Sequence, residues 1–130
     1  MTLPDAPPPW WPHADRSRHV EAAGLRWHVQ RWPHDRRNAP VALLLHGTGA
    51  ATHTWRHLAP LLAPDFDVIA PDLPGHAFTR TPASQALSLP AVARAVAALL
   101  DTMQARPTLI VGHSAGAAIA MRMVLDGLID

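Results

Sequence analysis

One serine lies in a pattern that is suited to nucleophilic chemistry. Ser114 is the centre of the pentapeptide GHSAG at Gly112–Gly116, which directly follows the apolar run Leu109–Val111. This is the G-x-S-x-G pattern, which holds a serine in a strained strand-to-helix turn at the edge of a sheet. Gly112 and Gly116 suit such a turn because larger side chains would collide with neighbouring backbone. The pattern predicts that Ser114 is a nucleophile, and the alternative is a tight turn in which Ser114 only caps a helix.

A second glycine-containing loop is placed where it could bind an oxyanion. The sequence HGTGA occupies His46–Ala50, directly after the apolar run Val41–Leu45. Acyl transfer needs two backbone N–H donors about 3 Å from the oxyanion, one after the nucleophile and one after an earlier strand. We therefore predict that Ala115 and Thr48 donate these N–H groups, with Gly47 as the loop glycine. The alternative is an ordinary strand-to-helix turn.

The elements that must position these loops are buried strands and crossover helices. Three runs are apolar at every position, as in strands of a parallel sheet covered on both faces: Val41–Leu45, Val68–Ala70 and Leu109–Val111. Helical spacing of apolar residues predicts a short helix at Leu58–Leu62 and a longer one at Pro90–Gln104, with Ser88 as its N-cap. A last helix, Ala115–Leu125, is apolar nearly all round, and we expect it to be buried on more than one side. The alternation of strands and helices predicts an α/β fold.

Two further segments precede this pattern. Residues 1–18 are rich in proline and predict an extended arm, whose Trp10 and Trp11 either pack back onto the body or dock a partner. Residues 19–130 are expected to form the domain itself. It begins with a β-hairpin, in which Ala23–Gly24 is the turn after a short run at Val20. The second strand should be half-buried, because apolar Leu25, Trp27 and Val29 alternate with polar Arg26, His28 and Gln30.

Composition excludes several classes of function. The chain of 130 residues has no cysteine, which excludes a disulfide framework, a thiolate nucleophile and an iron–sulfur or cysteine-type zinc site. A formal net charge of +1 gives no support to nucleic-acid binding. Neither a signal peptide nor an apolar run long enough to span a membrane is present in the sequence. The compartment stays open, with the cytoplasm as the default expectation. We expect no cofactor.

The motifs resemble those of the α/β-hydrolases over the range from Val20 to the last residue. The residues that carry the resemblance are the hairpin, His46–Gly47, Trp55, the Ser114 motif, and Pro71–Ala77, where Ala77 replaces a usual glycine. The resemblance implies an α/β-hydrolase fold, represented here by its N-terminal half from the hairpin to the helix after Ser114. It also implies that Asp72 is mostly structural.

The sequence resembles one branch of this family along nearly the whole chain. This branch is the magnesium-chelatase accessory hydrolases of bacteriochlorophyll synthesis. The similar segments are Gly24–Gln30, His46–Ala50, Thr52–Trp55, Leu58–Leu62, Leu87–Pro90 and Gly112–Ala118. This resemblance implies a role in magnesium insertion into protoporphyrin. It also implies a small acyl or porphyrin-type substrate and magnesium chelatase as a partner.

The family's catalytic acid and histidine follow the serine, in a protein about twice this length. Residues 115–130 contain no histidine, and we expect Asp126 and Asp130 to point away from Ser114. The sequence therefore predicts a nucleophile and an oxyanion hole without a general base. Three functions stay open: a serine hydrolase acting on an ester or acyl bond, a non-catalytic accessory or porphyrin-binding protein, and a truncated inactive fragment.

The other candidate residues are interpreted as structural or solvated. His46 is expected to hydrogen-bond within its loop, and His113 to pack within the fold. His53 and His57 are spaced as a metal pair, but no third ligand lies nearby, and no metal site is predicted. Exposed arginines are usually solvated, and the alternative is pairing with porphyrin propionates by Arg16, Arg18, Arg36 and Arg37.

Overall fold

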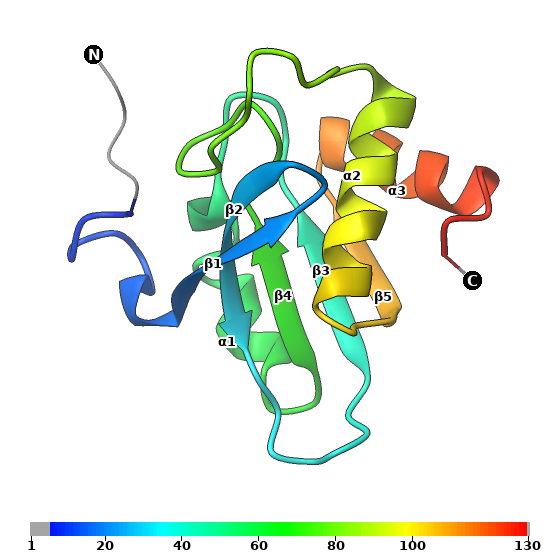
Figure 1. Cartoon of the computed structure of the whole chain (residues 1–130). Coiled ribbons are helices and arrows are strands. Elements are labelled where there is room, and N and C mark those ends of the chain that lie inside the picture. Colours follow the sequence, from blue (N-terminus) through cyan, green and yellow to red (C-terminus); the bar gives the residue numbers. More distant parts are fainter. Residues whose placement is uncertain (1–5, 130) are drawn as a thin grey trace.

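A computed structural model describes residues 6–129 and contains one mixed sheet within that range (Figure 1). The sheet order is β1-β2-β4-β3-β5, with β3 parallel to both β4 and β5. β2 is antiparallel to β1 and to β4. The strands are β1 (Ser17–Ala22), β2 (Leu25–Trp32), β3 (Val41–Leu45), β4 (Asp67–Pro71) and β5 (Pro107–Gly112). The hairpin, the three further strands and the α/β class are therefore confirmed, but β3 and β4 are buried whereas no residue of β5 is fully buried.

Helices cover both faces of this sheet. α2 (Leu89–Thr102) and α3 (Ala115–Leu125) lie on one face, and the short α1 (Leu58–Leu62) lies on the other (Figure 1). Two short 3-10 helices complete the elements, η1 (Ala14–Arg16) and η2 (Thr52–Trp55). The predicted cap of α2 is present, because the Ser88 hydroxyl accepts a hydrogen bond from the Ala91 N–H at 3.4 Å.

The continuous apolar runs reflect a core on each side of the sheet. Leu43 and Leu45 of β3 belong to the cluster that α2 and α3 cover. Leu44, which points the other way, packs with Trp55 and Ala59 beneath η2 and α1. Successive residues of a strand point to opposite faces, so a strand that packs against apolar side chains on both sides is apolar at successive positions.

β2 differs from the half-buried strand that alternation predicts. His28 and Gln30 are fully buried, with exposed fractions of 0% and 1%. The N-terminal arm covers Gln30, whose Nε2 donates to the carbonyl oxygens of Pro12 (2.8 Å) and His13 (3.1 Å). The turn after β4 covers His28. The second face of β2 is therefore buried, and its polar side chains are hydrogen-bonded rather than solvated.

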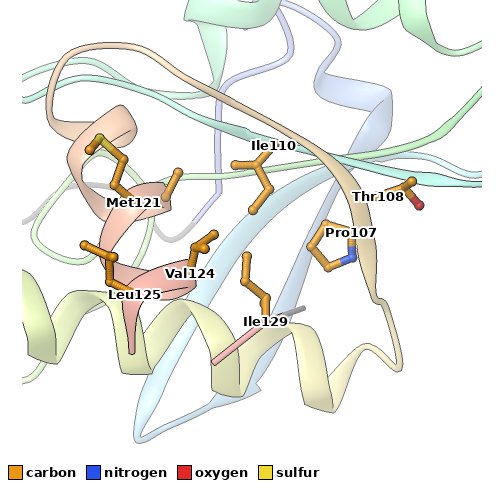
Figure 2. A pocket seen from close by; sticks show the side chains of 8 residues that line it. Pro107, Thr108, Ile110, Met121, Val124, Leu125 and Ile129 are labelled. Atoms are coloured by element: carbon orange, nitrogen blue, oxygen red, sulfur yellow. The ribbon is translucent and has the colours of Figure 1, made fainter. Parts of the chain in front are cut away.

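The prediction that α3 is buried on more than one side is wrong. Gly116, Ile119 and Met123 are buried, but Met121 is 64% exposed and Leu125 is 72% exposed. These exposed residues border an apolar groove of about 510 Å³ between α3 and β5 (Figure 2). Among the described strands, β5 pairs only with β3, so no neighbouring strand covers this side of α3.

The N-terminal arm packs on the body through one of its two tryptophans. Trp11 donates from Nε1 to Thr52 Oγ1 at 3.0 Å, and its ring meets the Phe78 ring edge-on at 5.1 Å. Trp10 is 78% exposed. η1 and the first residues of β1 lie within the range 1–18 assigned to the arm, and residues 1–5 of that range lie outside the described residues. Within residues 6–129, no helix is long and apolar enough to cross a membrane.

Candidate active site

Ser114 lies in the turn between β5 and α3, in a backbone conformation that few side-chain-bearing residues adopt. Its φ is 55° and its ψ is −115°, and the residue is exposed to solvent. Such conformations cost about 1–3 kcal/mol and persist where the surrounding structure enforces them. β5 ends at Gly112 and α3 begins at Ala115, so the serine is held at the carboxyl end of the sheet.

Two glycines make this turn possible. A Cβ atom on Gly112 would lie 2.5 Å from the Ala117 nitrogen. A Cβ atom on Gly116 would overlap the carbonyl oxygen of Leu45. The first contact keeps the opening turn of α3 close to β5, and the second keeps it close to the end of β3. The spacing of the two glycines on either side of Ser114 is therefore a steric requirement of this turn.

The loop after β3 reaches Ser114. A Cβ atom on Gly47 would lie 3.4 Å from Ser114 Cβ, so the loop passes close to Ser114 and has little room for a side chain at position 47. The sheet explains this proximity, because β3 and β5 are parallel neighbours and Leu45 pairs with Gly112. The structure thus places Gly47 close to Ser114, although the two residues are far apart in the chain.

Two backbone N–H groups in the loops after β3 and β5 have no partner in the part of the chain that the structure describes. Among residues 6–129, neither the Thr48 N–H nor the Ala115 N–H donates a hydrogen bond. Ala115 is the first residue of α3, where helical N–H groups have no intrahelical acceptor. Backbone N–H groups without a partner can bind a developing anion where they lie close to a nucleophile.

His46 is held by hydrogen bonds on both ring nitrogens. It is fully buried, its Nδ1 donates to the Gly47 carbonyl oxygen at 2.7 Å, and its Nε2 accepts from the Leu73 N–H at 3.0 Å. Burial lowers the pKa of His46 below its ordinary 6.5, against a smaller rise from the Gly47 carbonyl. The neutral ring thus ties the loop after β3 to the loop after β4.

His113 lies outside the core, contrary to the prediction that it packs within the fold. The residue is exposed, and its Nδ1 would lie 3.1 Å from a Cβ atom on Gly47. The reason is its place in the turn, since the tight turn directs the His113 ring along the sheet edge toward the Gly47 loop. A side chain larger than hydrogen at position 47 would therefore crowd the imidazole as well as Ser114.

His76, for which no role is predicted from the sequence, adjoins this edge. Its Nε2 accepts a hydrogen bond from the Gly49 N–H at 3.0 Å, and its ring meets the His46 ring edge-on at 5.0 Å. Its position in the sequence could have indicated this. His76 lies in the loop after β4, and β4 and β3 are parallel neighbours whose carboxyl ends lie at the same edge of the sheet. The adjoining turn is tightly wound despite its alanine, since Ala77 has a φ of +42°.

Asp72 is a buried structural acceptor rather than a free carboxylate. Its Oδ1 accepts from the Thr52 N–H at 2.8 Å, and its Oδ2 accepts from the Phe78 N–H at 3.1 Å. A third bond joins Oδ2 to His28 Nδ1 at 2.7 Å. These contacts fasten η2, the turn after β4 and strand β2 together.

The described residues hold no metal cluster and no base for Ser114. No group of three metal-ligating side chains occurs in residues 6–129, and the His53 ring packs on Trp11 at 5.2 Å. In the same range, no side chain hydrogen-bonds to Ser114 Oγ. Asp126, at the far end of α3, pairs with Arg122 at 2.7 Å, and Asp130 lies outside the described residues. The four arginines considered for propionates are exposed: Arg16, Arg18, Arg36 and Arg37.

Comparison with known proteins gives consistent matches. The family model described as the alpha/beta hydrolase fold matches residues 40–127. The magnesium-chelatase 30 kDa subunit of Rhodobacter capsulatus is 37% identical over 124 residues, which are 95% of this chain and 43% of that protein. Lipase LipV of Mycobacterium tuberculosis is 38% identical over 97 residues, covering 74% of this chain and 35% of the lipase.

A solved structure agrees with these sequence matches. Cfl2 of Burkholderia cenocepacia superposes with a TM-score of 0.74 at 30% identity, over 83% of this chain and 36% of that chain. The chain therefore spans less than half the length of the relatives and of the structure that it matches.

Proposed function

We propose that this chain, which belongs to the alpha/beta hydrolase fold family, carries the nucleophile and oxyanion-binding amides of a serine hydrolase for an ester or other acyl bond. The observation that supports this most strongly is the state of Ser114. The residue is exposed, has a φ of 55°, and lies close to Gly47 at the carboxyl end of the sheet. Strain of this kind clusters at functional sites because the surrounding structure must maintain it.

In the proposed reaction, Ser114 Oγ attacks the acyl carbon of the substrate. The negative charge that develops on the carbonyl oxygen is stabilised by the N–H groups of Thr48 and Ala115, together with the N-terminal dipole of α3. The hydroxyl proton must pass to a base, which then protonates the leaving group. We assign the base and its acid partner to polypeptide other than residues 6–129, as the greater length of the relatives allows.

The biological setting of this activity is inferred from similarity to the magnesium-chelatase subunit. We propose that the protein acts in association with magnesium insertion into protoporphyrin, with magnesium chelatase as partner. Its substrate would be a small acyl compound or a porphyrin-type molecule. The propionate side chains of such a porphyrin are the groups on which acyl chemistry is possible.

A second candidate function is that of a non-catalytic accessory protein that binds a porphyrin or the chelatase. The observation that favours it is that no side chain in residues 6–129 hydrogen-bonds to Ser114 Oγ. The two functions differ in one consequence. Replacement of Ser114 by alanine would leave an accessory effect on magnesium insertion unchanged, whereas it would abolish a hydrolytic one.

The proposal is tested in a chimaera in which this chain replaces the matching segment of the Rhodobacter capsulatus subunit, so that the remaining segment of that protein is present. We expect a fluorophosphonate probe to label Ser114 in the chimaera and Ser114→Ala to abolish that adduct. Ser84→Ala, a substitution of an exposed loop serine, is the matched control and should retain it. Absence of an adduct on Ser114 in a folded chimaera would refute the serine-hydrolase proposal.

A further inference from the structure

We infer that Ser17, His28 and Asp72 form a second serine-nucleophile site, distinct from Ser114, that accepts an acyl or phosphonyl group from a small activated reagent. Ser17 Oγ lies 2.7 Å from His28 Nε2, and His28 Nδ1 lies 2.7 Å from Asp72 Oδ2. A nucleophile in contact with a base, which a third group orients in turn, is the geometric signature of an activated serine.

Strand pairing brings these residues together. Ser17 lies directly opposite Gln30 in the β1–β2 pair, and His28 is two residues from Gln30 on the same face. Asp72 follows β4, whose last residue pairs with Val29 of β2. The Asp72 N–H donates to the His28 carbonyl oxygen at 2.9 Å, so the backbone fixes the carboxylate beside the imidazole.

The hydrogen bonds determine where the protons lie. The Asp72 carboxylate accepts from the backbone N–H groups of Thr52 and Phe78, so it acts as the acceptor toward His28 as well. His28 Nδ1 therefore carries a proton, and in the neutral ring Nε2 has the lone pair that accepts the Ser17 hydroxyl proton. Gln30 Nε2 donates to Ser17 Oγ at 3.3 Å, which is compatible with this direction.

The base is more buried than the nucleophile. This arrangement suits a reactive site, because the base is shielded from water while the nucleophile lies nearer the surface. His28 and Asp72 are both fully buried, which shields the pair from bulk water. Ser17 is half-buried and lies at the first position of β1, which pairs with β2 alone among the described strands. Beside the pair, the buried Nε2 of His19 has no hydrogen-bond partner among residues 6–129, which leaves one polar atom unsatisfied on this face.

The inferred step is acyl or phosphonyl transfer to Ser17. Ser17 Oγ forms a bond to the acyl carbon or phosphorus of the reagent while its proton passes to His28 Nε2. The bond to the leaving group then breaks, and the leaving group takes the proton from His28. An activated ester gives acyl-Ser17 and an alcohol, and a fluorophosphonate gives phosphonyl-Ser17 and hydrogen fluoride.

Mapping a fluorophosphonate adduct by mass spectrometry tests the site in the 130-residue chain. Trypsin would release Ser17 only within the dipeptide Ser17–Arg18, so digestion at acidic residues is required. We expect an adduct on Ser17 that Ser17→Ala removes and that Ser114→Ala and Ser84→Ala retain. Labelling of Ser17 no faster than labelling of the exposed Ser84 would overturn the inference. Adducts on Ser17 and Ser114 lie in different peptides, so this site and the proposed hydrolase site fail independently.

A cysteine variant tests the base without altering His28 or Asp72. The chain has no cysteine, so Ser17→Cys and the control Ser84→Cys each carry a single thiol. A free thiol has a pKa of about 8.5, which a histidine partner lowers and simple burial raises. We expect the midpoint of iodoacetamide alkylation against pH to lie at least ~1 unit lower for Ser17→Cys than for Ser84→Cys. Adding His28→Gln should abolish the difference. A midpoint equal to or above that of the control would show that Ser17 has only a structural role.

Discussion

Gly116 of α3 packs directly against the carbonyl oxygen of Leu45 at the end of β3, with no room for a Cβ atom between them. This contact seats the first turn of α3 on the sheet edge. In an unconstrained helix, Gly→Ala stabilises by about 1 kcal/mol. Here we expect urea unfolding to show that Gly116→Ala destabilises the chain by at least about 2 kcal/mol. The added Cβ atom would overlap the Leu45 backbone, which cannot relieve the overlap by a change of rotamer. A more stable Gly116→Ala variant would contradict this packing.

At Ala77 we expect the opposite effect on stability, because there glycine should stabilise the chain. Its φ of +42° is strained for a residue with a Cβ atom, and glycine adopts it freely. We expect Ala77→Gly to stabilise the chain by about 0.5–1 kcal/mol, which raises Tm by a few degrees. The control is Ala98→Gly within α2, which should lower Tm because glycine weakens a helix interior. A decrease of similar size in both variants would show that position 77 is not strained.

Acid should destabilise the fold through His46. Burial lowers the pKa of His46 below 6.5, so in the window between the folded and unfolded pKa values the unfolded chain binds more protons. The free energy of unfolding should therefore be highest above pH 6.5 and decrease as pH falls below it. Protonation of Nε2 would also remove the acceptor for the Leu73 N–H.

Thermal melts at pH 7.5 and pH 5.5 measure this effect. His46→Gln should be less stable at the higher pH and should show a smaller loss on acidification than the unsubstituted chain. The pKa of His19 is also lowered by burial, so His19→Gln is the comparison that separates the two histidines. An unchanged pH dependence in His46→Gln would rule out His46 as the source.

The exposed groove beside α3 should cause self-association. The free edge of β5 presents backbone donors and acceptors. Beside it lies an apolar surface formed by the exposed side chains of Met121, Val124 and Leu125 (Figure 2). We expect size-exclusion chromatography to show a concentration-dependent oligomer that Met121→Glu converts to monomer. Leu61→Glu, at an apolar residue 74% exposed on α1, is the control. A monomer at all concentrations, with a cooperative melt near about 60 °C, would contradict this expectation.

The 130-residue chain should not use Ser114 for turnover. Removing the base of a serine triad costs on the order of 10⁶ in kcat, and no described side chain hydrogen-bonds to Ser114 Oγ. Steady-state hydrolysis of p-nitrophenyl butyrate should therefore change less than about twofold on Ser114→Ala. A loss of more than tenfold would reveal a base that the hydrogen-bonding pattern does not show.

The helices and strands could be predicted where the hydrophobic pattern of the sequence agrees with the burial of the same residues in the fold. The runs Val41–Leu45 and Val68–Ala70 are apolar at every position because both faces of β3 and β4 are covered. Ser88 caps α2, as its position before the apolar periodicity indicates. The approach of Gly47 to Ser114 follows from parallel pairing of β3 with β5.

The predictions of burial that were wrong have a common physical cause. Whether these residues are buried depends on segments that are distant in the sequence. Burial of His28 depends on Asp72, which is distant in sequence, and burial of Gln30 depends on the arm. The exposed side of α3 lacks the cover that its apolar composition led us to expect. His113 was misplaced because its turn directs it toward Gly47 rather than into the core.

A crystal structure of the phosphonylated chimaera tests the central claim most directly, namely that Ser114 attacks and that Thr48 and Ala115 bind the oxyanion. We expect phosphorus bonded to Ser114 Oγ and a phosphonyl oxygen about 3 Å from both backbone nitrogens. Absence of phosphorus on Ser114 Oγ in the labelled chimaera, or a phosphonyl oxygen on Ser114 beyond hydrogen-bonding distance of these two amides, would contradict it.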